Sequence, residues 1–416
     1  MLSGIQAIKW GVKGSISIID QAVYSGANFI FIVLLARWLE PKDFGAFSVT
    51  YAIFSIFYQL HNGFISEPMS VLGPASYSTN ERSYLKIQTK LHFLFTFGAG
   101  FVYILVTFIS RLVLQPMSNN NHHYIYLGLV IPFMLLPWFV RRTYYFLKKP
   151  HYAAFTSIAY AVFLFSLTFV FKSAILQKTE TAYFIMATAG FAACILFLNL
   201  IRRAENQKLV KLGAIIKQNW NYGKWIILTG FLVSIANQMQ ILVIGSVGGL
   251  EDAGIIRALQ NFIQPMIVII SAISILVLPI FSAQFGKPEA ANFKRNGALI
   301  TYVVFIISLI YGLFLWIFRL QLENLFYGSK YVDYVNLIPL ISLVPIFTAL
   351  SIGASVILRA IQKPQALFVV SIGGFITSVF TSFVFIKIWG ITGALWSAVI
   401  TQAVSTFIFI VLMARR

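Results

Sequence analysis

Four polar side chains at the start of one apolar stretch have the types and the spacing to bind an anion. The last three follow the first by three, four and seven residues, which places all four on one face of a helix. An arginine guanidinium matches the geometry of phosphate oxygens, and amides can bind sugar hydroxyls. A helix end exposed to water would show the same pattern, so both interpretations stay open. The four residues are Arg257, Gln260, Asn261 and Gln264.

Several further polar residues interrupt apolar stretches, where a polar group is costly. Asn28 and Asn237 are 209 residues apart, and Gln238 and Gln240 lie beside the second asparagine. Such amides either line a polar cavity or hydrogen-bond neighbouring helices. Arg37, at the end of the first stretch, either supplies a second positive charge for binding an anionic ligand or extends its side chain to the membrane surface. We include Asn28, Arg37, Asn237 and Gln238 among the candidate binding residues.

Two acidic residues could bind a proton or a sodium ion. Asp20 lies in the first apolar stretch, where the alternative is an acid stabilised by the dipole at a helix N-terminus. Glu67 precedes Pro68 near the end of the second stretch. It could instead pair with a nearby basic residue. Both are candidates for ion coupling.

The sequence contains no motif for nucleotide hydrolysis or for metal or serine hydrolase chemistry. The patterns G-x-x-x-x-G-K-[ST], H-E-x-x-H and G-x-S-x-G do not occur. Glu251 and Asp252 lie in a short joint, and His122 and His123 follow three asparagines in what we interpret as a solvated turn. We therefore predict no catalytic residue, no metal site and no cofactor, and we expect a protein that is not an enzyme.

The elements that position these residues are apolar stretches of membrane-spanning length. The chain of 416 residues is 59% hydrophobic and 10% charged, and apolar segments of about 20 residues span a bilayer. We predict an all-α polytopic membrane protein with twelve transmembrane helices, and prolines predict kinks in the fourth, eighth and tenth of them. The predicted spans are 15–36, 45–70, 90–112, 124–141, 152–172, 181–201, 225–246, 257–283, 297–318, 334–357, 366–387 and 392–413.

The charge of the chain is distributed by side of the membrane. The formal net charge is +19, and most of the 31 lysines and arginines fall in the joints that share one side with the N-terminus. Positive joints are cytoplasmic, so both termini are predicted to be cytoplasmic. The same charges favour contact with anionic membrane lipids rather than nucleic acid. The segment 202–224 alternates basic and apolar residues and is predicted to form an amphipathic helix on the inner membrane surface.

The second half of the chain repeats the first. LEPKDFGAF contains Asp43 and Gly45, and GLEDAGIIR contains Asp252 and Gly254. The two aspartates are 209 residues apart, and so are the two glycines. Six predicted helices separate the copies, and because this number is even both halves enter the membrane in the same direction. We predict two pseudo-symmetric six-helix lobes around a central cavity. The lobes are 1–201 and 225–416, joined by the linker 202–224.

The joints resemble those of a known group of transporters. At 34–53 the sequence LLARWLEPKDFGAFSVTYAI resembles the first-joint signature of the Wzx-like polysaccharide and O-antigen flippases of the multidrug/oligosaccharidyl-lipid/polysaccharide exporter superfamily. Similar to later parts of that family are GSVGGLEDAGIIRALQNF (245–262), QKPQ (362–365) and WGITGALWSAVITQ (389–402). The resemblance implies a cavity that opens alternately to the two sides and a lipid-linked oligosaccharide as cargo.

Together these features favour a flippase of the bacterial inner membrane that moves an undecaprenyl-pyrophosphate-linked oligosaccharide for surface polysaccharide biosynthesis. A polysaccharide polymerase or another assembly protein is a candidate partner. One alternative is a cation-coupled multidrug antiporter of the same fold, which predicts a titrating acid and an aromatic cavity. A membrane glycosyltransferase or polymerase is disfavoured, because no long outer joint offers a catalytic site. A scaffold of an envelope assembly complex is a further alternative.

Overall fold

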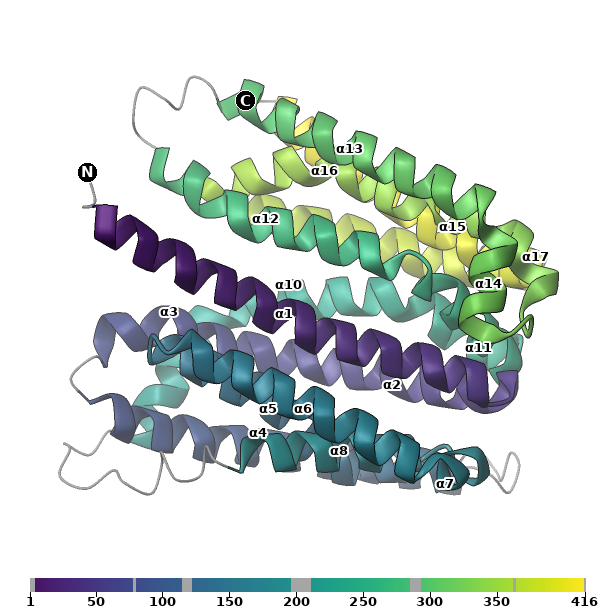
Figure 1. Cartoon of the computed structure of the whole chain (residues 1–416), viewed down its shortest axis with the longest axis horizontal. Helices are drawn as coiled ribbons and strands as arrows, with labels where there is room; N and C mark the ends of the chain where they lie inside the picture. The colour runs from purple at the N-terminus through teal and green to yellow at the C-terminus, as the bar shows by residue number, and fades with distance from the viewer. Residues whose placement is uncertain are drawn as a thin grey trace. The chain divides into compact units, whose positions relative to one another are not determined.

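The computed structural model describes residues 4–77, 80–113, 122–195, 211–284, 293–361 and 364–414, and these ranges form helices and no strands (Figure 1). The first helices are α1 (Gly4–Trp38), α2 (Pro41–His61), the π-helix η1 (Asn62–Ser66), α3 (Glu67–Ser76), α4 (Glu81–Val113), α5 (His122–Phe146), α6 (Pro150–Val170), α7 (Lys172–Gln177) and α8 (Thr181–Cys194). The later helices are α10 (Leu212–Val247), α11 (Leu250–Asn261), α12 (Gln264–Gln284), α13 (Phe293–Ile317), α14 (Arg319–Tyr327), the 3₁₀-helix η3 (Val332–Leu337), α15 (Ile338–Ile341), α16 (Leu343–Ala360) and α17 (Pro364–Ala414).

The predicted spans fall mainly on helical backbone. Within the described ranges, nine helices are long and apolar enough to cross a membrane, and α8 is a shorter apolar helix. The second predicted span is divided among α2, η1 and α3, and the tenth among η3, α15 and α16. Of the predicted linker, residues 202–210 lie outside the described residues. From Leu212 onward it forms the beginning of α10.

The eighth predicted span is broken between α11 and α12. Phe262 and Ile263 separate the two helices, and Pro265 follows at once. Proline has no N–H to donate to the carbonyl of Asn261, and its ring collides with that carbonyl. The prediction of one continuous helical face from Arg257 to Gln264 is therefore wrong, because Gln264 begins the second helix.

The last two predicted spans form a hairpin inside α17. Gly390 has φ 53° and ψ −126°, a backbone conformation that side chains disfavour. The hydroxyl of Ser397 lies 2.7 Å from that of Thr381 and 2.9 Å from that of Ser382. Contacts between residues so far apart along one helical segment require the chain to reverse at Gly390.

Contacts divide the chain into two compact units. The first is Met1–Ile32 with Ile53–Gly230, and the second is Val33–Ala52 with Phe231–Arg416. In the first unit α5 packs against α4, α6 and α8, and in the second α16 packs against α12, α13 and α17. A side chain added at Gly100 of α4 would overlap the backbone of Gly128 of α5, and one at Gly353 of α16 would overlap Gly297 of α13. The fourth and tenth predicted spans thus occupy equivalent places in the two units.

The second unit includes the end of α1 and the first half of α2, which the sequence assigns to the N-terminal lobe. There α2 and α11 cross at Gly45 and Gly254. A side chain at Gly45 would overlap the carbonyl of Leu250, and one at Gly254 would overlap the carbonyl of Pro41. Each glycine thus faces the residue four positions before the other, so the crossing has the twofold relation expected of the repeat.

Candidate functional site

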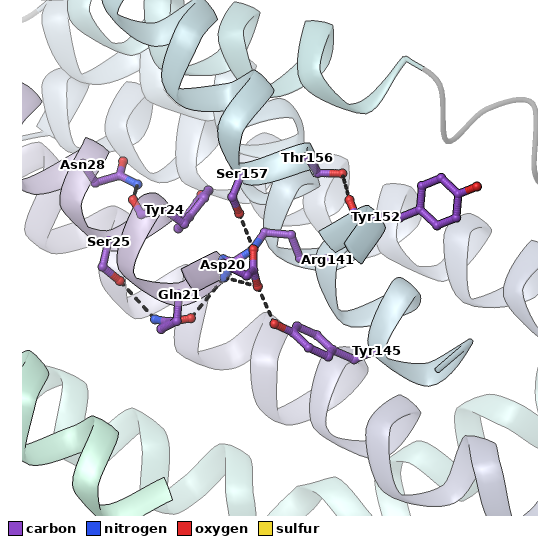
Figure 2. Close-up of polar contacts among 10 residues, drawn as sticks. All are labelled: Asp20, Gln21, Tyr24, Ser25, Asn28, Arg141, Tyr145, Tyr152, Thr156 and Ser157. Carbon is purple, nitrogen blue, oxygen red and sulfur yellow. Dashed lines mark hydrogen bonds and ion pairs between the residues drawn. The ribbon is translucent and has the colours of Figure 1, made fainter. Parts of the chain in front are cut away.

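A buried ion pair lies in the first unit between α1 and α5. Arg141 donates from Nε to Oδ1 of Asp20 and from Nη2 to Oδ2, both at 2.9 Å (Figure 2). The side chain of Asp20 is 0% exposed and that of Arg141 is 3% exposed. This parallel arrangement is the strongest geometry for an arginine and a carboxylate.

The remaining lone pairs of the carboxylate are also occupied. Tyr145 donates to Oδ2 at 2.5 Å, and Ser157 of α6 donates to Oδ1 (Figure 2). Arg141 Nη2 also donates to the side-chain oxygen of Gln21 at 3.1 Å. Four donors therefore converge on one carboxylate, as a buried charge requires.

Two aromatic rings cover the guanidinium of Arg141. Its central carbon lies 4.3 Å from the ring centroid of Tyr24 and 5.1 Å from that of Trp138. These distances are within the range of cation–π attraction. One nitrogen, Nη1, has no hydrogen-bond partner. The site therefore combines a satisfied carboxylate with an arginine that retains one free donor.

The position of Asp20 excludes one of the two explanations offered by the sequence. Helix α1 begins at Gly4, so Asp20 lies more than four turns into the helix. The helix dipole acts only within the first turn. The explanation by a helix N-terminus is therefore wrong, and the carboxylate is stabilised by Arg141 and its other donors.

The repeat-related amides have different surroundings. Asn28 donates to the Tyr24 carbonyl at 2.9 Å (Figure 2). Its side-chain oxygen accepts from the Tyr160 hydroxyl at 3.0 Å, which joins α1 to α6. Asn237 is exposed on α10. Gln238 is half-buried, and its side-chain oxygen has no partner. Asn28 thus holds two helices together. On α10, Gln240 is buried and donates to the Ser378 hydroxyl at 3.3 Å, whereas the Gln238 oxygen has no partner among the described residues.

Arg257 of α11 is a buried cation in the second unit. It is 7% exposed, and its guanidinium carbon lies 5.3 Å from the ring centroid of Tyr51. Its Nε has no hydrogen-bond partner, and no described carboxylate forms an ion pair with it. Within the described part of the chain, the buried charge of Arg257 therefore has no counter-charge.

The polar residues near Arg257 in the sequence differ in their burial and hydrogen bonding. Asn261 is buried and donates to the Tyr327 hydroxyl at 3.3 Å, and that hydroxyl donates to the Ala258 carbonyl at 3.0 Å. Gln260 is half-buried, as is Gln264 at the start of α12. The structure keeps Arg257, Gln260 and Asn261 on one helix.

Arg37 has a structural partner at the end of α1. Its Nη1 donates to the Leu325 carbonyl at 2.9 Å, and the side chain is exposed. Lys330 donates from Nζ to the carbonyls of Arg37 at 2.7 Å and Leu39 at 2.6 Å. Burial lowers the pKa of Lys330, and the nearby Glu40 carboxylate partly offsets this. The end of α1 is therefore fastened to the α14–η3 segment.

Glu67, the second acidic candidate, begins α3 and is half-buried. It follows η1, a π-helix of the kind that often accompanies functional sites. Beside η1 lies a pair of fully buried imidazoles that sequence reasoning did not identify. His61 Nε2 and His92 Nδ1 are 2.8 Å apart, and His92 Nε2 has no partner. The pair joins α2 to α4 by a hydrogen bond between the two rings.

Arg141 is the main site residue that the sequence did not indicate, since it lies at the end of the predicted span 124–141, beside Arg142, like the other basic residues of a cytoplasmic joint. One signal was present: Arg141 and Tyr145 are four residues apart and share a helical face. Ser157 and Tyr160 gave no signal of their own, because neither is unusual in an apolar helix.

Comparison with known proteins relates the chain to transporters. A family model described as polysaccharide biosynthesis protein matches residues 12–285. A multidrug resistance MATE family transporter of the MOP superfamily, in an inward-facing conformation, has a TM-score of 0.77 at 14% identity over 96% of this chain and 98% of that chain. An outward-facing structure of a multidrug resistance MATE family transporter has a TM-score of 0.66 at 14% identity, over 97% of this chain and 94% of that chain.

A MOP superfamily transporter from Pyrococcus furiosus is similar to the same extent. Its TM-score is 0.65 at 14% identity, over 97% of this chain and 94% of that chain. No curated protein matches the chain. Identity this low relates the chains by fold alone. The predicted all-helical membrane fold is confirmed by these likenesses.

Proposed function

Because this chain belongs to the polysaccharide biosynthesis protein family and has the fold of a multi-pass membrane transporter, we propose that it is a flippase for a lipid-linked oligosaccharide. The carrier lipid is undecaprenyl pyrophosphate, and the protein works by alternating access in a bacterial inner membrane with both termini in the cytoplasm. A polysaccharide polymerase or another assembly protein receives the product.

The observation that supports an anionic cargo is the buried, unpaired Arg257. Arginine keeps its charge in proteins, and a buried charge without a partner costs several kcal/mol. A pyrophosphate offers a pair of oxygens that match the guanidinium fork. Binding of such a group would satisfy Nε, which has no partner in the free protein.

The amides near Arg257 and on α10 suit the sugar part of such a cargo. Gln260 is half-buried on the helix of Arg257, and Asn237 is exposed on α10. The side-chain oxygen of the neighbouring Gln238 has no partner among the described residues. Amides both donate and accept, so they can bind hydroxyls in either direction. We assign these residues to cargo binding. Asn28 and Arg37 we reassign to positioning roles, because each is bonded within its own unit.

Asp20 is our candidate for coupling transport to an ion. Protonation of this carboxylate would remove the counter-charge of Arg141 and weaken both 2.9 Å bonds. Arg141 would then need another anion or water. Ionisable pairs inside membrane helices are frequent parts of proton relays. Glu67 is the second candidate for this role.

Export of glycan in a bacterial strain that lacks its own flippase tests the proposal. Arg257→Ala should abolish most export while membrane abundance is unchanged, and Arg257→Lys should restore part of it because the charge is kept but the fork is lost. Arg295→Ala, which removes an exposed arginine, is the matched control. Export at the wild-type rate by Arg257→Ala would exclude the role of this cation.

A multidrug antiporter is the second candidate, and one observation favours it. Asp20 and Arg141 lie among the aromatic rings of Tyr24 and Trp138, and aromatic faces attract organic cations. Two of the similar solved structures are of a multidrug resistance MATE family transporter. The test is efflux of a cationic dye from cells that express the chain, measured per molecule of protein in the membrane. Efflux that is lost in Asp20→Asn beyond any loss of membrane abundance, and unaffected in Arg257→Ala, would support this function over glycan export.

A further inference from the structure

A groove of about 580 Å³ runs between α13, α16 and α17 in the second unit. These helices lie side by side in Figure 1, and α16 packs against both of the others. The groove is lined almost wholly by apolar side chains, among them Phe305, Leu350, Ile357 and Met413. Its lining would repel water and accept a hydrocarbon chain.

Small residues create the groove. Gly297 of α13 and Gly353 of α16 bring the two backbones into contact, and Ala298 and Ala354 lie beside them in the lining. With side chains this short, neighbouring large residues form walls and the small ones form a floor. The Thr301 hydroxyl on this floor already accepts from the Gly353 N–H at 3.1 Å. This bond joins α13 to α16 at the floor of the groove.

The groove opens on the outer surface of the unit. Tyr302 and Ile410 line it and are 63% and 49% exposed. The adjacent Leu299 and Val303 of α13 are exposed as well. In a transporter that spans the membrane, an exposed apolar surface of this kind faces lipid chains. The ligand therefore enters from the bilayer.

One end of the groove carries a positive charge. Lys294, in the first turn of α13, is exposed and is the charged member of the lining. From Lys294 to Phe305 the helix rises about 16 Å. The hydrocarbon core of a bilayer is about 30 Å thick, so the groove matches one leaflet. The positive charge at one end of the groove and the apolar surface along its length complement the headgroup and the acyl chain of an anionic lipid.

We propose that this groove is a binding site for an anionic phospholipid, with one acyl chain along α13 and the phosphate paired with Lys294. A phospholipid fits better than a polyprenyl carrier because the apolar length is that of one leaflet. A lysine near the membrane surface attracts anionic headgroups, so the charge of Lys294 selects the headgroup. The site does not depend on the identity of the transported cargo.

Native mass spectrometry of the full chain in detergent tests this site with phosphatidylglycerol and phosphatidylcholine of identical chains. The wild-type protein should retain several-fold more phosphatidylglycerol. Lys294→Gln should reduce its retention to that of phosphatidylcholine. Arg295→Gln changes the neighbouring exposed cation, which does not line the groove, and should retain phosphatidylglycerol as the wild-type protein does. Ala298→Leu, which fills the exposed part of the floor, should reduce retention of both lipids.

Equal effects of Lys294→Gln and Arg295→Gln would overturn the headgroup assignment, and unchanged retention in Ala298→Leu would overturn the groove. Undecaprenyl phosphate is the competitor. If it displaces phosphatidylglycerol from the wild-type protein at lower concentration, the groove holds the carrier lipid and the proposal is wrong. Thermal unfolding of each variant, with a midpoint expected within about 2 °C of that of the wild-type protein, verifies that loss of lipid is not loss of fold.

Discussion

Removing the charge of Asp20 should strongly destabilise the first unit. The perturbation is Asp20→Asn, which keeps the size of the side chain. The carboxylate accepts from Arg141 twice and from Tyr145 and Ser157 once each. An asparagine offers one acceptor oxygen and an amide that would meet donors, so the site loses the bonds at one of its two oxygens and leaves the guanidinium without a counter-charge.

The magnitude follows from the two bonds lost. Hydrogen bonds to charged groups contribute about 1.5–3 kcal/mol each, and breaking a buried ion pair by removing one partner costs about 3–5 kcal/mol. Arg141→Met should cost a similar amount, because it leaves the carboxylate buried. The double variant carries neither charge, so it should be more stable than the sum of the single effects by about 2–3 kcal/mol.

Equilibrium unfolding by denaturant in mixed micelles measures the four proteins of this cycle. Arg142→Met removes the neighbouring, half-buried arginine and should change the free energy of unfolding by only about 0.5 kcal/mol. The reasoning is refuted if the free energy of unfolding of Asp20→Asn equals that of the wild-type protein. It is also refuted if the change in this free energy in the double variant equals the sum of the changes in the two single variants.

Three further predictions concern packing and topology. Gly254→Ala should lower membrane abundance severely because the methyl group would overlap the Pro41 carbonyl, whereas Gly213→Ala, with no atom within 4 Å, should be tolerated; equal abundance would contradict the crossing. Lys330→Met should leave carbonyls at the end of α1 unpaired, which should lower the free energy of unfolding by about 1–3 kcal/mol and lower the unfolding midpoint. An unchanged midpoint would show that Lys330 does not stabilise the end of α1. Reporter fusions after Asn120 and Asn206 should report the outside and the inside, and the reverse result would contradict the predicted orientation.

The fold was largely predictable because a bilayer permits few choices. Apolar segments of sufficient length must satisfy their backbone groups internally, so each predicted span could only be helical. Pro265 predicted a kink, and the structure breaks the helix two residues before it. The association of residues 33–52 with the second unit was not predictable, because it depends on contacts with Leu325 and Lys330 that no local pattern encodes.

The candidate site was predictable by residue type but not by partner. Asp20 was conspicuous as an acid in an apolar stretch, and yet Arg141, its partner, is 121 residues away. Helical periodicity relates residues within a few turns only. Arg257 was likewise conspicuous, and only the three-dimensional structure gives its burial and the lack of a partner for Nε.

The crossing of α2 and α11 has a consequence for how this sequence can evolve. Because Gly45 faces Leu250 and Gly254 faces Pro41, the two copies of the duplicated motif are each other's environment. A larger residue in one copy could be accommodated only if the other copy moved, so the copies cannot diverge independently. The ancestral duplication therefore remains readable in the sequence at the place where its two products touch.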